Sequence, residues 1–225
     1  MGLFDWLRRL VAINGRRPRP NGYPSVTGAG TDLWTCWHRL VPMREQDLYS
    51  PTQLLRSPRQ VPAAPGIYAW YFDALPRIPT ANCYSVGRWR LMYIGTAPRN
   101  EDSSGNLRKR ICKQHLGKSV SASTLRFSLA FLLQKELDLE ITRRKQGDKS
   151  WWLGAAGEQS LTDWMCDHAL VAWSAVPQPW EHEGRMVGVL GGALPLNIRG
   201  NTSNPLALRL KRDRTRWRKR CLGIE

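Results

Sequence analysis

The sequence predicts a mixed α/β fold of the α+β kind: a small three-stranded antiparallel sheet flanked by helices. Three short apolar runs indicate the strands, because they are rich in aromatic or β-branched residues and two of them begin or end at Pro or Gly. They lie at residues 65–72, 90–95 and 170–176. Leucines at helical spacing between the second and third runs, and Arg-rich segments near both ends of the chain, complete the pattern.

The net charge is the strongest bulk signal. The 225 residues include 34 Lys and Arg against 18 Asp and Glu, which gives a formal charge of +16. Such an excess attracts polyanions over long distances, and DNA or RNA is the commonest partner of that kind. The alternatives are a basic protein that is merely soluble, or one with a membrane-surface patch.

No apolar run approaches the ~20 residues that cross a bilayer. Residues 1–11 are apolar, but Asp5, Arg8 and Arg9 interrupt them and no small-residue cleavage site follows. We therefore expect a cytoplasmic protein without stable membrane association. The five cysteines lack the close pairs of a zinc site, which indicates reduced thiols with structural roles.

Two segments precede the sheet. Residues 1–30 combine an amphipathic start with a basic arm rich in Gly, Pro and Arg. We interpret the start as a helix docked on the domain, with a membrane-surface helix as the alternative. Residues 31–59 predict a short helix or two leading into a domain that spans residues 60–205.

The connection between the first two strands is too long for a tight hairpin, so we expect a protruding loop. After the second strand, Asn106 or Ser104 can cap a helix that ends at Gly117. One face of this helix carries Leu107, Ile111 and His115.

A second helix is expected over residues 124–137, capped by Ser123. The elements after it are a hairpin over 139–144 and 149–153, a short helix opened by a capping box at 160–163, the third strand, a helix over 180–190 and an Asn-rich turn over 193–205. We expect the third strand to be a central one, because it is apolar almost without interruption.

Residues 206–225 form a basic tail or helix. Eight Lys and Arg residues surround Trp217 between positions 209 and 220. The charge run fits either a solvated helix face or an extension that follows the phosphates of a nucleic acid.

Two triplets in the strands are distinctive: Gly66-Ile67-Tyr68 and Tyr93-Ile94-Gly95. The helix segment 107–111, a later helix with Glu183, and the turn Leu194-Pro195-Leu196-Asn197 follow them in order. Together these parts resemble the GIY-YIG nuclease superfamily, over about residues 60–205. The chain looks closest to stand-alone bacterial members that are similar to restriction-type nucleases. The resemblance implies the same three-stranded sheet that the residues predict.

The resemblance also implies roles for five residues. Tyr68 would be the general base or its hydrogen-bonding partner, and a nearby cation would have to lower its pKa from ~10. Tyr93 would position the attacking water, and Arg110 would hold a phosphate oxygen. Glu183 would bind one divalent cation, either Mg²⁺ or Mn²⁺. Asn197 would orient Glu183 or the phosphate.

Each residue also has a structural interpretation. The tyrosines could be core aromatics, and Arg110 one more surface cation. The metal-binding role of Glu183 has two competitors, Glu181 and Glu158. We choose Glu183 because Met186 and Val187 follow it at helical spacing, which turns it towards the sheet.

One position departs from the pattern of the family. A His or Tyr usually follows the helix arginine by four residues, but Gln114 stands there and His115 follows Arg110 by five. Five residues of a regular helix turn ~140° away, whereas four turn ~40°. Either the helix is distorted and His115 takes the proton-transfer role, which we favour, or Gln114 fills the position and cannot exchange protons.

The expected function is therefore metal-dependent hydrolysis of phosphodiester bonds in DNA by an endonuclease. The alternative is a nucleic-acid-binding module that has kept the fold and lost the chemistry. The basic residues expected to contact nucleic acid are Arg108, Lys109, Lys113, Lys211, Arg212, Arg214 and Arg216. A single active site cuts one strand per engagement, so double-strand cleavage would require a homodimer or two visits. The sequence does not define the target site or the biological pathway.

Overall fold

The computed structural model describes residues 39–42, 44–117, 119–145, 150–202 and 204–224. The expected amphipathic start and basic arm of residues 1–30 lie outside these segments. In the part that is described, no helix is both long enough and apolar enough to cross a bilayer. Four cysteines are described there, and all four are free thiols.

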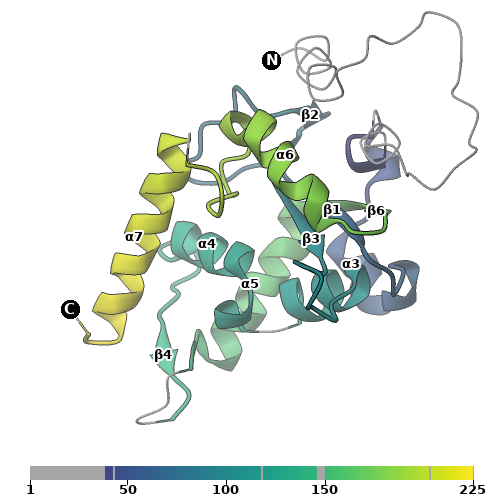
Figure 1. The fold of residues 1–225 in the computed structure, drawn as a ribbon. Coiled ribbons are helices and arrows are strands. Elements are labelled where there is room, and N and C mark those ends of the chain that lie inside the picture. The colour runs from purple at the N-terminus through teal and green to yellow at the C-terminus, as the bar shows by residue number, and fades with distance from the viewer. Residues whose placement is uncertain (1–38, 43, 118, 146–149, 203, 225) are drawn as a thin grey trace, which may run out of the picture.

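The main sheet has four strands in the order β2-β3-β1-β6, and all neighbours are antiparallel (Figure 1). The three expected strands are confirmed as β1 (Gly66–Phe72), β3 (Trp89–Ala97) and β6 (Ala169–Ala175). The additional strand β2 (Ser85–Val86) has only two residues. A strand of this length carries no alternation pattern, so the sequence gives little sign of it.

The third strand does not take the central place that its apolar sequence suggested. The central strand is β1, which pairs with β3 on one side and β6 on the other. Strand β6 lies at the edge of the sheet, where Tyr49 forms a bridge to Val171. This bridge and the packed helices keep β6 largely buried, which accounts for its apolar composition.

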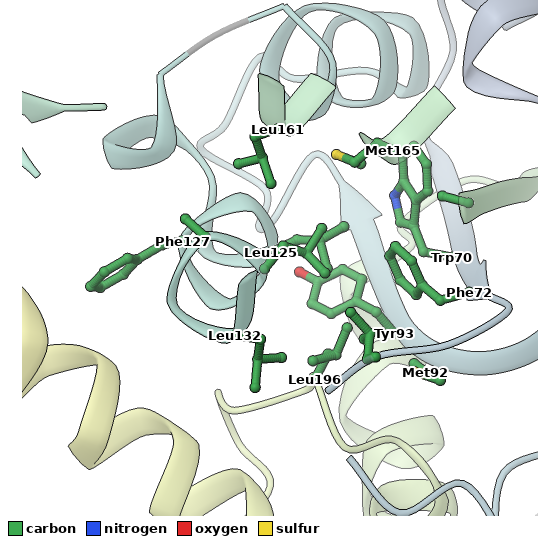
Figure 2. Close-up of a cluster of buried hydrophobic side chains, with 14 of the residues drawn as sticks. Trp70, Phe72, Met92, Tyr93, Leu125, Phe127, Leu132, Leu161, Met165 and Leu196 are labelled. Carbon is green, nitrogen blue, oxygen red and sulfur yellow. The ribbon is translucent and has the colours of Figure 1, made fainter. Parts of the chain in front are cut away.

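Side chains of β1 alternate between two hydrophobic clusters, one on each face of the sheet. Tyr68, Trp70 and Phe72 enter the larger cluster, with helices α4 (Thr124–Leu133) and α5 (Gly154–His168). In Figure 2, Leu125 of α4 extends towards the aromatic side chains of the sheet, and Met165 of α5 lies near Trp70. The other face packs against helix α6 (Trp180–Leu190) and the segment from Leu40 to Leu48.

Two of the expected helices differ in extent. Helix α4 ends at Leu133 rather than near residue 137. Helix α5 begins at Gly154, six residues before the capping box at Ser160, so the expectation of a short helix from Ser160 is wrong. The physical reason lies in Glu158, whose carboxylate accepts hydrogen bonds from the backbone N–H groups of Leu153 and Val120. These bonds fix an earlier start.

The expected hairpin is confirmed as a two-stranded sheet of β4 (Thr142–Arg143) and β5 (Trp151–Trp152). The short helix α3 (Pro51–Arg56) begins with a capping box at Ser50 and lies in the expected lead-in. Short helical turns join these elements: η1 (Glu45–Asp47), η2 (Pro58–Gln60), η4 (Val120–Ala122) and η5 (Gly191–Ala193).

The basic tail forms helix α7 (Pro205–Cys221), which is capped by the Asn204 side chain and lies beside α4 (Figure 1). Ala207, Leu210 and Trp217 are buried in the larger cluster, and Trp217 stacks near Phe127 of α4. The helix is therefore amphipathic: one face completes the core and the other carries the exposed charges.

Candidate active site

A β-bulge brings Tyr68 and Tyr93 to the same face of the sheet. Tyr93 pairs with Trp70 and Leu91 pairs with Tyr71, so Met92 is an extra residue in β3. In a regular strand of the same sequence, Tyr93 would share the face of Leu91, because side chains two residues apart point to the same side. Instead both tyrosines lie in the larger cluster, with ring centroids 6.2 Å apart.

The glycines of the two triplets allow close approach. A Cβ atom on Gly95 would overlap the hydroxyl of Tyr68, and its ring carbon Cζ would lie at 2.6 Å. A Cβ atom on Gly66 would meet the Ser174 carbonyl oxygen and the side chain of Leu107. Each glycine therefore leaves space that Tyr68 or the Leu107 side chain occupies.

The helix that carries Arg110 is a π-helix from Lys109 to His115, extended at its start by Leu107 and Arg108. Its capping by Asn106 is as expected, since the Asn106 side chain accepts from the Lys109 N–H. In a π-helix the hydrogen bonds join residues five apart, as the bond from Leu116 N–H to Ile111 O does. Arg110 and His115 are therefore one turn apart and lie on the same side.

The π-helix brings both Gln114 and His115 to the site, although they are adjacent in the sequence. His115 is fully buried, and its Nε2 lies 2.9 Å from the Tyr68 hydroxyl. Arg110 donates from Nε to the same hydroxyl at 3.1 Å, and from Nη1 to Gln114 Oε1 at 2.7 Å. Both residues reach the site: His115 contacts the phenol and Gln114 orients the guanidinium.

His115 is held on its second nitrogen as well. Its Nδ1 lies 2.8 Å from Ser123 Oγ, which also accepts from the Arg126 N–H at the start of α4. The buried Arg126 side chain donates to the His115 carbonyl and forms an ion pair with Glu158 at 2.9 Å. Burial, with the charges of Arg110 and Arg126, holds the pKa of His115 well below its ordinary value. The ring is therefore neutral near pH 7.

The two tyrosines are also neutral. Burial raises the pKa of Tyr68 well above 10, with Tyr93 adding to the shift and Arg110 opposing it. Burial likewise raises the pKa of Tyr93, and Arg110 again opposes it. A phenolate formed before substrate arrives is disfavoured, because water does not solvate it.

Glu183 approaches from the other face of the sheet. Thr96, one residue after the second triplet, donates its hydroxyl to Glu183 Oε2 at 2.9 Å. Its two competitors lie elsewhere: Glu158 is paired with Arg126, and Glu181 is exposed and does not line the site. Of the three carboxylates, Glu183 is therefore the one that lies at the site.

Asn197 is buried and binds the backbone of β3. Its Oδ1 accepts from Ile94 N–H at 2.8 Å, and its Nδ2 donates to Ile94 O at 2.7 Å. The neighbouring Leu196 N–H donates to Met92 O. The turn thus acts as a substitute strand along the free edge of β3, and these amide atoms contact Ile94 rather than Glu183.

These side chains surround a hollow of about 170 Å³. Its lining includes Tyr68, Tyr93, Arg110, Glu183 and Asn197, with Thr96, Arg99, Thr124, Ile198 and Arg199 between them. Among the described residues that line it, Glu183 is the only carboxylate. His115 stands behind Tyr68 and contacts the hollow through that phenol.

Comparison with known protein families identifies a domain that covers the strands and helices of this site. The family model of the GIY-YIG catalytic domain matches residues 66–219, more than half of the chain. The chain belongs to the GIY-YIG family. Nuclease-type hydrolysis is the activity of this domain at the level of the family. No curated protein and no solved structure matches the chain. The GIY-YIG match extends past residue 205 into α7, in agreement with the burial of Trp217 in the shared core.

The basic residues expected at a nucleic-acid surface occupy different environments in this GIY-YIG domain. Lys109 and Lys113 on the π-helix are exposed, as are Lys211, Arg212 and Arg216 on α7. Arg108 is half-buried and donates to the Val61 carbonyl.

Arg214 differs from the expectation of an exposed contact residue. It is buried, donates to Thr124 O and Ser128 Oγ, and lies 4.6 Å from the Phe127 ring. Burial lowers its pKa to about 10, with Tyr93 opposing and Arg218 adding to the shift. Its contacts join α7 to α4, because the apolar face of α7 turns this position inward.

Several site residues were not identified from the sequence, among them Thr96, Arg99, Arg199 and Ser123 as a partner of His115. Thr96 and Arg99 follow the second triplet within four residues, and Arg199 follows Asn197 by two. Their closeness to the motifs is the signal that could have found them. Ser123 was recognised only as a helix cap.

Proposed function

We propose that this protein is a divalent-metal-dependent endonuclease that hydrolyses phosphodiester bonds in DNA. The observation that carries the proposal is the hydrogen-bonded set of His115, Tyr68 and Arg110 at one hollow that Glu183 also lines. Phosphodiester hydrolysis needs a base for water, a cation for the phosphate and stabilisation of the leaving oxygen.

The proposed base is the Tyr68–His115 pair. When Nδ1–H is donated to Ser123, the lone pair of Nε2 faces the Tyr68 hydroxyl. Tyr68 can then take a proton from the attacking water while its own proton passes to His115. This relay avoids a buried phenolate, which the raised pKa of Tyr68 disfavours. Tyr93, on the same face, positions the water.

Arg110 is the proposed phosphate ligand. Its bonds to Tyr68 and Gln114 fix the plane of the guanidinium at the wall of the hollow. A planar cation held in this way can bind phosphate oxygens without further ordering, and it lies beside the proposed base.

Glu183 is the proposed metal-binding residue. Within the described segments, no group of three or more His, Cys, Asp or Glu side chains could hold a metal ion. One carboxylate in a hollow fits Mg²⁺ or Mn²⁺, which takes oxygen ligands and completes its shell with waters and substrate phosphate. It does not fit Zn²⁺, which requires three or four protein ligands. When bound, the cation would neutralise charge that develops on the phosphate and leaving oxygen.

DNA is the proposed substrate because the charge of +16 attracts a polyanion and exposed cations flank the hollow. Lys109 and Lys113 stand on the π-helix, and Lys211, Arg212 and Arg216 on α7 offer further phosphate contacts. A binding module without activity was the alternative, and it rested on Gln114 replacing a proton-transfer residue. The contact between His115 and Tyr68 supports the enzyme over that alternative.

Plasmid DNA provides the test. With Mg²⁺, the wild-type protein should convert supercoiled plasmid to its nicked or linear form. With a chelator, the plasmid should stay supercoiled. Glu183→Gln should abolish conversion, whereas Glu181→Gln, an exposed carboxylate on the same helix, should retain it. Intact plasmid in every lane, where binding to DNA is verified, would overturn the proposal. Equal loss in both variants would reject Glu183 as the specific metal-binding residue.

A further inference from the structure

A second hollow of about 480 Å³ adjoins the proposed catalytic one. The two share Thr96, Arg99, Arg110 and Arg199, so they are continuous across these side chains. The walls of the second hollow come from the loop after β3 and from the π-helix. A ligand in the catalytic hollow can therefore extend into the second one without leaving the surface.

The second hollow is cationic. Arg99, Lys109, Arg110 and Arg199 line it, and its lining contains no Asp or Glu. Within the described segments, no carboxylate forms an ion pair with any of these four residues. Four unneutralised cations around one hollow repel each other, and an anion relieves that repulsion.

The rest of the lining points to a sugar–phosphate backbone rather than to a base. Asn100, Ser103 and Gln114 offer short hydrogen-bonding groups, and no aromatic side chain lines the hollow. Unstacked bases are usually held on aromatic rings, whereas phosphates are held by Arg, Lys and small polar groups.

The arginines divide into two groups. Arg110 is fixed by Tyr68 and Gln114 and is the proposed ligand of the scissile phosphate. Arg99 and Arg199 are exposed and come from separate segments, the loop after β3 and the turn before α7. They meet at the boundary of the two hollows, where a strand must pass from one to the other.

We propose that the second hollow binds the phosphate next to the scissile one, with Arg99 and Arg199 as its ligands. The inference rests on the proposed function for the choice of DNA as ligand. Its consequence is a fixed path: one strand is held at two successive phosphates, so the scissile bond enters the catalytic hollow in one direction.

The salt dependence of DNA binding tests this site without any cleavage. A labelled duplex is titrated in chelator over ~50 to ~200 mM salt with the wild type and with the double variant Arg99→Ala/Arg199→Ala. Loss of one phosphate contact should reduce the slope of log affinity against log salt by about 0.9. Affinity at a fixed salt concentration should fall roughly tenfold.

Two further double variants separate charge at this site from charge in general. Arg99→Lys/Arg199→Lys should keep the slope of the wild type. Arg44→Ala/Arg56→Ala removes two exposed arginines that line neither hollow, and should also keep it. An unchanged slope in the alanine variant, or an equal decrease in the Arg44/Arg56 control, would overturn the inference. Cleavage together with an unchanged slope rejects only the second site. A reduced slope in a protein that never cleaves rejects only the catalytic proposal.

Discussion

His115 Nε2 lies 2.9 Å from the Tyr68 hydroxyl, although the two residues are 47 positions apart in the chain. The contact depends on a π-helix, because in an α-helix His115 would point ~140° away from Arg110. A wider helical turn thus places a neutral imidazole beside Tyr68, although position 114 carries Gln.

His115→Ala should lower the single-turnover cleavage rate about 10²-fold or more, because Tyr68 loses its proton acceptor. Gln114→Ala should have a smaller effect, since it removes only a bond that orients Arg110. Both rates are measured at saturating Mg²⁺, with melting temperatures to verify folding. Equal effects of the two variants would mean that His115 contributes no more to cleavage than Gln114 does.

Ser123→Ala should reduce both stability and activity. The hydroxyl caps α4 and binds His115 Nδ1. Its loss should lower the free energy of unfolding by about 0.5–2 kcal/mol, and the tautomer of His115 would no longer be fixed by this bond. Ser50→Ala provides the matched control, because Ser50 caps α3 and contacts no site residue. If Ser50→Ala reduces cleavage as much at equal stability, the Ser123–His115 contact has no catalytic role.

Stability should fall below about pH 6.5 because of His115. Its pKa in the folded state is depressed by burial, whereas in the unfolded chain it is near ~6.5. The unfolded state therefore binds the proton first, and stability present above pH ~6.5 is lost as the pH falls towards the folded pKa. The slope approaches about 1.36 kcal/mol per pH unit.

Urea unfolding at several pH values measures this slope, with His115→Gln as the comparison. The variant lacks the titrating ring. Its free energy of unfolding should therefore change less steeply with pH, by about 1.36 kcal/mol per pH unit, between pH ~6.5 and the folded pKa of His115. Parallel curves for the two proteins would mean that His115 is solvated in the folded state.

Gly95→Ala should displace Tyr68, because the new methyl group would occupy the space of a rigid, buried phenol. We expect a loss of about 1–3 kcal/mol in stability and a cleavage rate close to background. Gly188→Ala is the control: nothing lies within 4 Å of a Cβ atom there, and alanine favours the helix. Normal cleavage by Gly95→Ala would show that Tyr68 needs no fixed position.

Much of the site follows from local sequence, because Gly66, Tyr68, Tyr93 and Gly95 lie in strands with clear apolar patterns. Helix α6 and its Glu183 could also be predicted, since one helical period spans the whole element. The π-helix could not be predicted, because it differs from an α-helix by one residue per turn and tertiary contacts decide between them.

Other parts depend on contacts between distant residues. The start of α5 depends on Glu158 meeting Val120, and the buried position of Arg214 depends on α7 packing against α4. Neither contact has a local signature, so propensity placed the helix start at Ser160 and left Arg214 among the surface cations.

The pairing of β1 with β3 sets which lengths of this chain can vary. The loop between Phe72 and Ser85 can gain or lose residues without turning either tyrosine, because the pairing of β1 with β3 does not depend on it. Deletion of Met92 alone would remove the bulge and leave Tyr93 opposite Trp70 and Leu91 opposite Tyr71, so Tyr93 would keep its face. Deletion of Ile94 would instead place Thr96 rather than Gly95 opposite Tyr68. Homologous chains should therefore differ in length at that loop, while the number of residues from Tyr93 to Gly95 stays constant.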